Sequence, residues 1–431
     1  MEDLFIRNAR FILTPNSLDN TIVYENKDIV IENGIITCIG DHCSKPRGSL
    51  VIDASKHVIT PAYINAHTRA GTAFLRGSMP DQEYWDLIRN KKILEEKLVS
   101  PELVFHSSRL SCAEMLLNGI MGFVDAYYYP EETIEACIDL GLHVSTGPSM
   151  PVEKELRSFL SKYKNIDKVH PIINIPNMNH SRLEELEQSF SLARKYGLKI
   201  HLQVSETRRE VFLFKKHIGH WPIEYLYKKK LLGEDVYLVN ANWVSSTELE
   251  YISEEKAALI ICPHRSMRLA IGGFAPVYEA MRKHILLTVG TDDFTGDRMN
   301  VLSEIRELLL LYRHYYKDTR LRLGHTYSYT VVNGYRVMGI KGGSIKESYP
   351  ANLVVYDIDA LKNTPLHPQN LLSRLILGNG FTPHYVVVDS HVIYDSSKHD
   401  ELVKKIQESI AFLERISQRI NYETGEPVEQ A

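Results

Sequence analysis

The chain has 431 residues, 44% of them hydrophobic and 24% charged, a balance that excludes a disordered or collagen-like chain. Lys and Arg number 50 against 54 Asp and Glu, so the formal net charge is −4 and no basic excess is available to hold a phosphate backbone. We therefore expect no nucleic-acid partner. The chain is too long for one ordinary globular domain, unless that domain is a barrel accompanied by a second, smaller domain.

The first 57 residues predict short β-strands. The segments LFIRNARFIL, DIVIENGIITCIG and VIDASKHVI are rich in strand-forming residues, and turns such as Glu32-Asn33-Gly34 separate them. The opening MEDLFIRNAR is charged and lacks the apolar stretch of a signal peptide, so we expect none.

Residues 58–343 predict a barrel, because short apolar runs alternate there with amphipathic helical patterns. In chain order the runs are VITPAYINAH, IMGFVDAYYY, HVSTGPSM, VHPIINIPN, LKIHLQVSE, VYLVNANWV, AALIICP and ILLTVGTDD. Strand followed by helix, repeated eight times, is typical of a (β/α)₈ barrel of the TIM type, in which functional residues lie where the strands end. No apolar run reaches the length of a membrane span, and RELLLLYRHYY from Arg306 predicts a core helix.

Strands are predicted again near the C-terminus. ANLVVYDID from Ala351 and HYVVVDSHVIYD from His384 alternate apolar and polar residues, so we expect one small β-sandwich domain built from both chain ends. The expected division of the chain is 1–57 and 344–398 for the two parts of the sandwich, 58–343 for the barrel, and 399–431 for a C-terminal helix and tail.

The final helix, HDELVKKIQESIAFLERISQRI, has one apolar stripe, which predicts packing on the sheet domain or on a partner chain. The stripe consists of Leu402, Ile406, Ile410, Leu413 and Ile416. The five cysteines are scattered and form no CxxC pair: Cys38, Cys43, Cys112, Cys137 and Cys262. They predict reduced thiols in a cytoplasmic protein.

Polar residues close several of the eight runs, and their surroundings resemble the amidohydrolase superfamily. PAYINAHTRAGTAFLRG is similar to that family's PGxxNxHTHxxxTxLRG, HLQVSET to HTHLAET, and LLGEDVYLVNANWVSSTELEYI to LLGPRVLLAHCVWLSDEEI. The likeness covers nearly the whole chain. It is strongest to the branch of chlorohydrolases and amino-heterocycle deaminases, which includes the atrazine and N-ethylammeline chlorohydrolases. It implies a hydrolase acting on carbon–nitrogen bonds other than peptide bonds, and a homodimer.

The resemblance also implies a mononuclear metal, zinc or iron, that makes hydroxide available near neutral pH. The family holds it with an HxH pair, a fifth-strand His and an eighth-strand Asp, and adds a proton-shuttling Glu and a sixth-strand His. Three positions of this sequence match that pattern: His67, Glu206 and Asp292. Three depart from it, with Arg69 at the second His of the pair, Gln203 at the fifth-strand His and Asn240 at the sixth-strand His.

These departures predict that the usual metal site is lost and that no cofactor is bound. Arg cannot ligate a metal, because its guanidinium stays protonated and presents only donors. A Gln amide is a poor ligand for an ion that prefers imidazole or thiolate. Instead we expect Arg69 to pair with Asp292 in place of the metal. The predicted ligand-binding residues for a small polar or anionic molecule are His67, Arg69, Gln203, Asn240 and Asp292.

Two other functions stay open, so the sequence leaves enzymatic activity uncertain. The chain could be an active deaminase of an amino-substituted heterocycle, working through Glu206 and Asp292 without a metal or with a displaced one. The residual metal candidates are His67, His201 and Asp292, with Cys262 or His264 as further donors. The third function is a structural, oligomer-forming relic of an enzyme.

Each candidate residue also has a structural explanation. Arg69 could be a surface residue, and Glu206 could be a residue in the first turn of a helix. Asn240 could be a buried amide with its hydrogen bonds satisfied. Asp292 could cap a helix, and its neighbour Asp293 could then be the residue at the eighth-strand position. Trp85 could line the pocket or the core. Arg265, in a rim loop, could add a second positive contact for an acidic ligand or lie in solvent.

Overall fold

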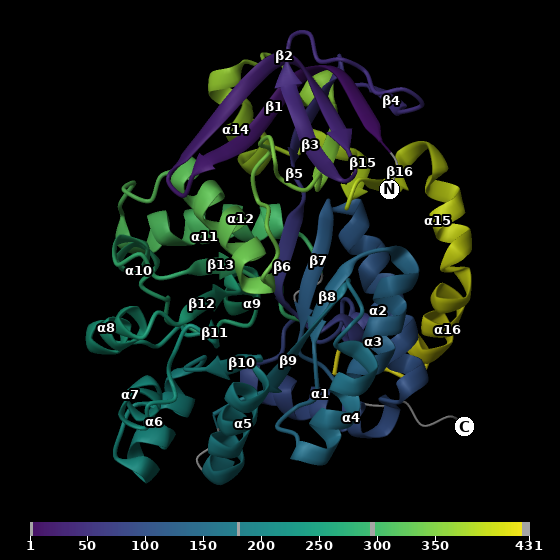
Figure 1. Cartoon of the computed structure of the whole chain (residues 1–431). Helices are drawn as coiled ribbons and strands as arrows, with labels where there is room; N and C mark the ends of the chain where they lie inside the picture. The colour runs from purple at the N-terminus through teal and green to yellow at the C-terminus, as the bar shows by residue number, and fades with distance from the viewer. Residues whose placement is uncertain (1–2, 179–181, 294–297, 425–431) are drawn as a thin grey trace.

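A computed structural model of the chain describes residues 3–178, 182–293 and 298–424. The larger part is an eight-stranded parallel barrel surrounded by helices, and a separate, mostly antiparallel sheet made from both chain ends covers one end of it (Figure 1). Strand β5 leads through Ala62 directly into the first barrel strand, β6. The small sheet therefore lies where β6 begins, and the ends of the barrel strands point away from it.

All eight predicted runs form barrel strands. They are β6 (Tyr63–Thr68), β7 (Ile120–Asp125), β8 (His143–Thr146), β9 (Val169–Ile175), β10 (Lys199–Val204), β11 (Val236–Asn240), β12 (Ala258–Ile261) and β13 (Leu287–Val289). The barrel closes between β13 and β6, where Asp292 N donates to His67 O at 3.0 Å and Arg69 N donates to Asp292 O at 3.2 Å. Gly290 permits this approach, because a Cβ there would lie 2.6 Å from the Cβ of His67.

Helices connect and enclose the strands. They are η1 (Ala70–Leu75), α1 (Tyr84–Leu98), α2 (Pro101–Leu117), α3 (Pro130–Leu140), α4 (Glu153–Tyr163), α5 (Leu183–Tyr196), α6 (Arg208–Ile218), α7 (Pro222–Lys228), α8 (Ser246–Glu254), α9 (Pro263–Arg268), α10 (Val277–Arg282), α11 (Val301–Tyr316) and α12 (Leu323–Met338). The RELLLLYRHYY segment lies in α11, which buries Ile305, Leu308, Leu309 and Tyr312. The predicted core helix is therefore confirmed.

The small sheet joins both chain ends, as predicted. Its strands are β1 (Leu4–Ser17), β2 (Asn20–Glu32), β3 (Ile35–Gly40), β4 (Leu50–Asp53), β5 (His57–Pro61), β14 (Leu353–Ile358), β15 (Phe381–Val388) and β16 (His391–Asp395). They are hydrogen-bonded in the order β16-β15-β14-β5-β1-β2-β3, and β4 pairs with β1. The predicted turn between β2 and β3 is present, with Asn33 and Gly34 at φ 51° and 84°, as a two-residue hairpin of this kind requires.

The two faces of this sheet serve different cores. Along β14, Leu353 and Val355 belong to a core inside the small domain, whereas Val354 and Tyr356 belong to the core shared with the barrel. Successive side chains of a strand point to opposite faces, so one strand supplies both cores. The helices α13 (Ala360–Asn363) and α14 (Pro368–Leu377) lie between β14 and β15. The division at 57/58 and 343/344 stays a prediction.

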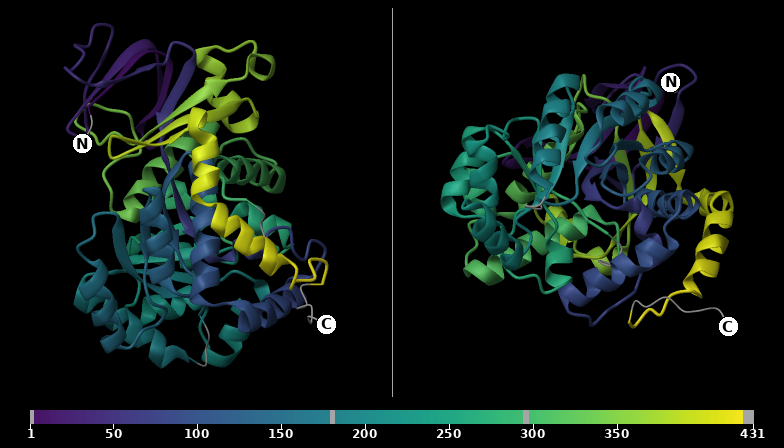
Figure 2. Two further views of the ribbon diagram at one scale, coloured as in Figure 1. Left: turned by 90° about the vertical axis from the view of Figure 1, so that its right-hand side faces the viewer. Right: turned by 90° about the horizontal axis from the view of Figure 1, so that it is seen from below.

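The C-terminal helix differs from its predicted form. It is two helices, α15 (His399–Lys405) and α16 (Gln407–Ser417), which run from the small sheet down the side of the barrel (Figure 2). Ser409 on α16 contacts His106 Nδ1 of α2 at 2.9 Å, and the ring of Phe412 stacks on His106 at 4.4 Å. Helix α16 thus packs mainly on a barrel helix of its own chain. Residues 425–431 of the predicted helix and tail lie outside the described residues.

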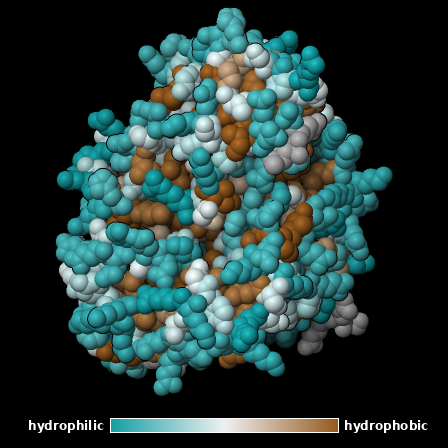
Figure 3. All heavy atoms as spheres, viewed as in Figure 1, coloured by the Kyte–Doolittle hydropathy of each residue, from teal (hydrophilic) through white to brown (hydrophobic). Residues whose placement is uncertain are grey.

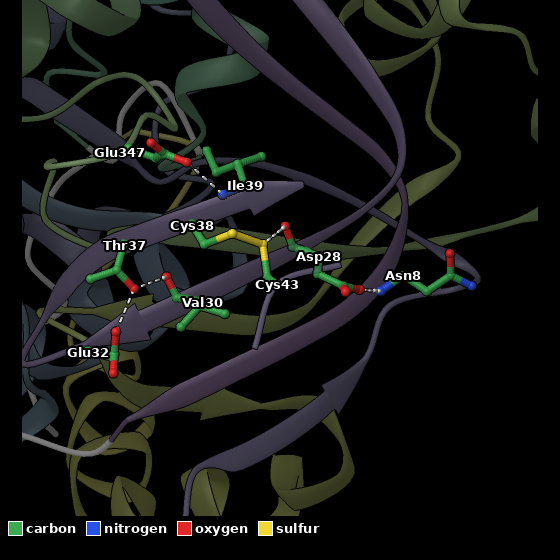
Figure 4. Close-up of a disulfide and its surroundings, with 9 residues drawn as sticks. All are labelled: Asn8, Asp28, Val30, Glu32, Thr37, Cys38, Ile39, Cys43 and Glu347. Carbon is green, nitrogen blue, oxygen red and sulfur yellow. Dashed lines mark hydrogen bonds between the residues drawn. A yellow bond between two sulfur atoms is a disulfide. The ribbon is translucent and has the colours of Figure 1, made fainter. Parts of the chain in front are cut away.

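Two of the five cysteines are joined, which corrects the prediction of reduced thiols. Cys38 on β3 and Cys43 in the following loop form a disulfide (Figure 4). Their Cα atoms lie 6.0 Å apart, within the usual range for such a bond. Their spacing of five residues is not a CxxC motif, so the sequence pattern did not indicate the bond. Next to the bond, Ile39 N donates to Glu347 Oε1 at 3.1 Å and ties β3 to the C-terminal part of the chain (Figure 4).

Hydrophilic side chains cover most of the face shown in Figure 3, and hydrophobic ones appear between them as separate patches. Within the described parts of the chain, no helix combines the length and the apolar character needed to cross a bilayer.

Candidate active site

The predicted site residues come together at the ends of the barrel strands. His67 lies on β6, Gln203 on β10 and Asn240 at the end of β11, while Asp292 follows β13; all four are buried. Asn240 and Asp292 adopt left-handed backbone conformations, with φ 70° and 59°. Such conformations are uncommon outside glycine and gather at functional sites. The barrel therefore places the expected side chains at one mouth.

Arg69 turns inward rather than toward solvent. Its Nη2 donates to Gln203 Oε1 at 2.5 Å, and its Nε lies 3.6 Å from Asp292 Oδ1. His67 Nε2 lies 3.3 Å from the other Asp292 oxygen. Neither Arg69 Nε nor the Asp292 oxygens make a hydrogen bond of good geometry. The pairing expected from the sequence is thus present as a close ion pair rather than as a charge-assisted hydrogen bond.

A second guanidinium reaches the same carboxylate. Arg265 lies on α9, which follows β12, and only 1% of its surface is exposed. It donates through Nη1 to Glu206 Oε1, and its Nε lies 3.3 Å from Asp292 Oδ2. The sequence placed Arg265 in a rim loop and left a solvated side chain open. The structure instead buries it: Pro263 starts the short helix α9 soon after β12 ends, and Arg265 on that helix reaches the buried carboxylates.

A third cation completes the cluster. Lys91 Nζ donates to Asp293 Oδ2 at 2.5 Å, and both side chains are buried. Lys91 was not among the predicted site residues, although its place in the apolar pattern of α1 is a signal for it. Buried Leu87, Leu94 and Leu98 place it on the apolar stripe of α1, where a charge needs a partner.

Fixed cations of the chain compensate most of the negative charge in this cluster. The cations are Arg69, Arg265 and Lys91, and the carboxylates are Asp292, Asp293, Glu206 and, paired with Lys91 at 3.7 Å, Glu95. Burial alone would raise the pKa of Asp292, but the charges of Arg265, His67 and Arg69 hold it well below its ordinary value. Burial would lower the pKa of Arg265, yet the carboxylates of Asp292 and Glu206 raise it well above its ordinary value. Both groups therefore stay charged.

Glu206, the predicted proton shuttle, has its acceptor positions filled. Oε1 accepts from Arg265 and from Asn240 Nδ2, the latter at 3.2 Å. Oε2 accepts from Gln203 Nε2 at 2.9 Å and from the Tyr84 hydroxyl at 3.0 Å. A carboxylate offers about four acceptor positions. Four donors thus occupy them. Gln203 and Asn240 depart from the family pattern, and Arg265 and Tyr84 were not predicted to touch Glu206.

The metal ligands expected of the family are not reproduced here. Arg69 and Gln203 contact each other where the family has two of its histidines. A divalent ion on Asp292 would stand within about 4 Å of guanidinium groups, a repulsion of ~8 kcal/mol per guanidinium at an effective dielectric constant of about 20. The residues present do not fit the family's mononuclear centre.

A smaller set of possible ligands remains. One donor atom each of His67, Cys262 and Asp292 lies within 4.8 Å of the others, and all three residues are buried. Burial raises the pKa of the Cys262 thiol well above its ordinary value. His201, a predicted residual ligand, is not in this group, although its ring centroid lies 4.9 Å from that of His67. His264 contacts Glu307 Oε2 at 2.8 Å through Nδ1.

A cavity of about 480 Å³ opens outside the cluster. Arg69, Gln203, Glu206 and Arg265 are among its polar lining residues, and its other walls include the aromatic residues Tyr84, Trp85, Tyr127 and Tyr128. His67, Asn240 and Asp292 are not among its lining residues. Of the predicted ligand-binding residues, Arg69 and Gln203 are thus the ones that face this cavity. A wider groove of about 800 Å³ adjoins it through Tyr84, Trp85 and Thr207.

The sequence has clear relatives. A sequence profile of the amidohydrolase family matches residues 58–393. A 5-methylthioadenosine/S-adenosylhomocysteine deaminase of Aquifex aeolicus is 29% identical over 370 residues, which cover 81% of this chain and 85% of that protein. A 5′-deoxyadenosine deaminase of Methanosphaera stadtmanae is 28% identical over 398 residues, or 88% of this chain and 93% of that protein.

Solved structures share the fold. An adenosine deaminase from Xanthomonas campestris with bound zinc superposes with a TM-score of 0.85 and 21% identity, covering 96% of this chain and 99% of that one. An atrazine chlorohydrolase from Arthrobacter aurescens, complexed with zinc, gives a TM-score of 0.82 at 19% identity, covering 94% and 100%.

Proposed function

The chain belongs to the amidohydrolase family, and from this premise we propose that it binds a purine nucleoside or a similar amino-substituted heterocycle in the barrel mouth without metal-dependent hydrolysis. The names of its relatives support the ligand class, since they are deaminases of adenosine derivatives. The cavity supports it as well, because about 480 Å³ suits a small ligand and aromatic side chains bind flat rings.

The observation that carries the absence of hydrolysis is the pairing of Arg265 with both Glu206 and Asp292. In a metal hydrolase of this family the carboxylates would be used to hold the ion and to transfer protons. Here each has a guanidinium as counter-ion, and the four donors on Glu206 leave it no free acceptor position. A guanidinium does not lose its proton, so it cannot act as a general base.

Binding and turnover can be measured separately. We expect 5′-methylthioadenosine or adenosine to raise the melting temperature in the presence of a chelator, while no ammonia is released. Trp85→Ala should remove the shift, because Trp85 forms part of the cavity wall. Trp221→Ala, at the residue that precedes α7 and outside the lining of the cavity, serves as the matched control and should keep it. No shift with any adenosine derivative would contradict the proposed ligand class.

A second function, deamination with a displaced metal, is favoured by the relatives' names and by the donor group of His67, Cys262 and Asp292. It requires an ion beside Arg265, whose Nε lies 3.3 Å from Asp292 Oδ2. Ammonia release that appears on adding zinc and disappears in Cys262→Ser would establish this function. Ammonia release in the presence of chelator would instead point to a metal-free deaminase and would overturn the proposed absence of hydrolysis.

A further inference from the structure

A second group of metal-type ligands lies outside the barrel, in the small sheet. His57, Asp357 and His384 each offer one donor atom, and the three atoms lie within 4.8 Å of one another. Asp357 Oδ1 is 3.1 Å from His57 Nε2, and Oδ2 is 2.9 Å from His384 Nδ1. We propose that this group binds a divalent transition-metal ion of the zinc type and joins the two chain ends.

The sheet brings the three residues together on neighbouring strands. His57 lies on β5 and pairs in register with Asp357 on β14, while His384 lies on β15. The register between β14 and β15 shifts there: Tyr356 pairs with Pro383 and Val355 with Tyr385, so His384 is an extra residue in a bulge. Bulges re-aim side chains and are frequent next to functional sites. The bulge thus turns His384 toward the other two residues.

The donor atoms suit an ion of this kind. Zinc binds imidazole nitrogen and carboxylate oxygen at about 2.0–2.2 Å in a tetrahedron, so neighbouring ligand atoms lie roughly 3.3 Å apart. The two imidazoles contact different oxygens of Asp357, at 3.1 Å from Oδ1 and 2.9 Å from Oδ2, and one donor atom of each residue lies within 4.8 Å of the others, so the side chains need to move closer together to share one ion. Two imidazoles and one carboxylate favour zinc, cobalt or nickel over calcium or magnesium.

Charge and access also favour binding. In the described part of the chain, the ion-pair partners of Asp357 are His57 and His384, with no Lys or Arg among them. The side chain of Asp357 is 50% exposed and that of His384 is 25% exposed, so an ion can reach them from solvent. Since His57 comes from the N-terminal part of the sheet and the other two from the C-terminal part, a bound ion would hold the two parts together.

The test is a titration of chelator-treated, full-length protein with zinc chloride by calorimetry, and with cobalt by visible absorption. The wild type should bind zinc and gain at least ~2 °C in melting temperature. The variants His384→Gln and His57→Gln should each bind one equivalent of zinc less than the wild type, and zinc should no longer raise their melting temperature. His391→Gln, on the same sheet but outside the group, is the matched control and should retain both.

His67→Gln separates this site from the barrel. Zinc binding that survives in His67→Gln and is lost in His384→Gln supports the small-sheet site. The reverse pattern places the ion in the barrel and overturns the proposal, as does the absence of binding in the wild type. Circular dichroism checks that the variants fold. An absence of zinc binding would overturn this proposal and leave the proposed function standing, whereas zinc that depends on His67 would count against both.

Discussion

The chain contains two similar groups of side chains with opposite surroundings. His67, Cys262 and Asp292 lie at the barrel mouth, and His57, Asp357 and His384 lie in the small sheet. Beside Asp292, two guanidinium groups stand at 3.3 and 3.6 Å. Beside Asp357, the described structure shows only imidazoles as ion-pair partners. From this comparison we expect similar donors to bind a metal ion only where no fixed cation already compensates the carboxylate.

The largest expected effect comes from removing the central cation of the barrel. Arg265→Met should lower the free energy of unfolding by ~3–5 kcal/mol, because breaking a buried ion pair leaves an uncompensated charge. Urea denaturation measures this change. Arg268→Met, on the same helix, is the control, since its guanidinium contacts the Pro80 carbonyl near the surface; it should cost under ~1 kcal/mol. Equal losses in the two variants would mean that the barrel cluster is not held by charge.

The same variant predicts a pH dependence. In the wild type the folded pKa of Asp292 lies below its unfolded value, so its pairing stabilises the fold above about pH 4 and is lost as the pH falls through the folded pKa. In Arg265→Met that pKa should rise, and protonation should relieve the buried charge. The stability gap between the two proteins should therefore narrow from pH 7 toward pH 4, by up to ~1.4 kcal/mol per pH unit. A gap that stays constant in denaturation series would contradict the assigned pairing.

Arg69→Met tests the second guanidinium beside Asp292, which we expect to contribute less to stability than Arg265 does. The Arg69 side chain is 17% exposed, and one of its hydrogen bonds goes to the uncharged amide of Gln203 rather than to a carboxylate. We therefore expect a loss of only ~1–2 kcal/mol in the free energy of unfolding. The nucleoside-induced melting shift should fall as well, because Arg69 lines the cavity. Arg76→Met, whose guanidinium pairs with Glu114 at a more exposed position, provides the control. An unchanged shift would remove Arg69 from the binding site.

The smallest effect is expected in the small sheet without metal. His384→Gln in chelator should change the free energy of unfolding by under ~1 kcal/mol, because its partner Asp357 is half exposed and such pairs are screened by water. The contrast between the two groups would be sharpened if added zinc then raised the free energy of unfolding of the wild type but not that of His384→Gln. A loss as large as that of Arg265→Met would show that the imidazole–carboxylate contacts alone hold the sheet.

Much of the fold was predictable because it follows from local periodicity. Eight apolar runs gave eight barrel strands, and the alternation of apolar and polar residues near both chain ends gave one shared sheet. The disulfide between Cys38 and Cys43 was not predicted, since whether two cysteines join depends on the path of the loop between them. A homodimer and a cytoplasmic location stay predictions.

The site was predictable only in part, for a related reason. The sequence by itself determined which residues close the barrel strands and which of them depart from the amidohydrolase pattern, because strand parity and chain order fix these positions. It did not determine what compensates Asp292. That depended on Arg265 being buried by a short helix, on Lys91 lying on the inner stripe of α1, and on a bulge at His384 in the other group. Charge pairing acts over a few ångströms in space between residues far apart in the chain, so only the tertiary structure decided it.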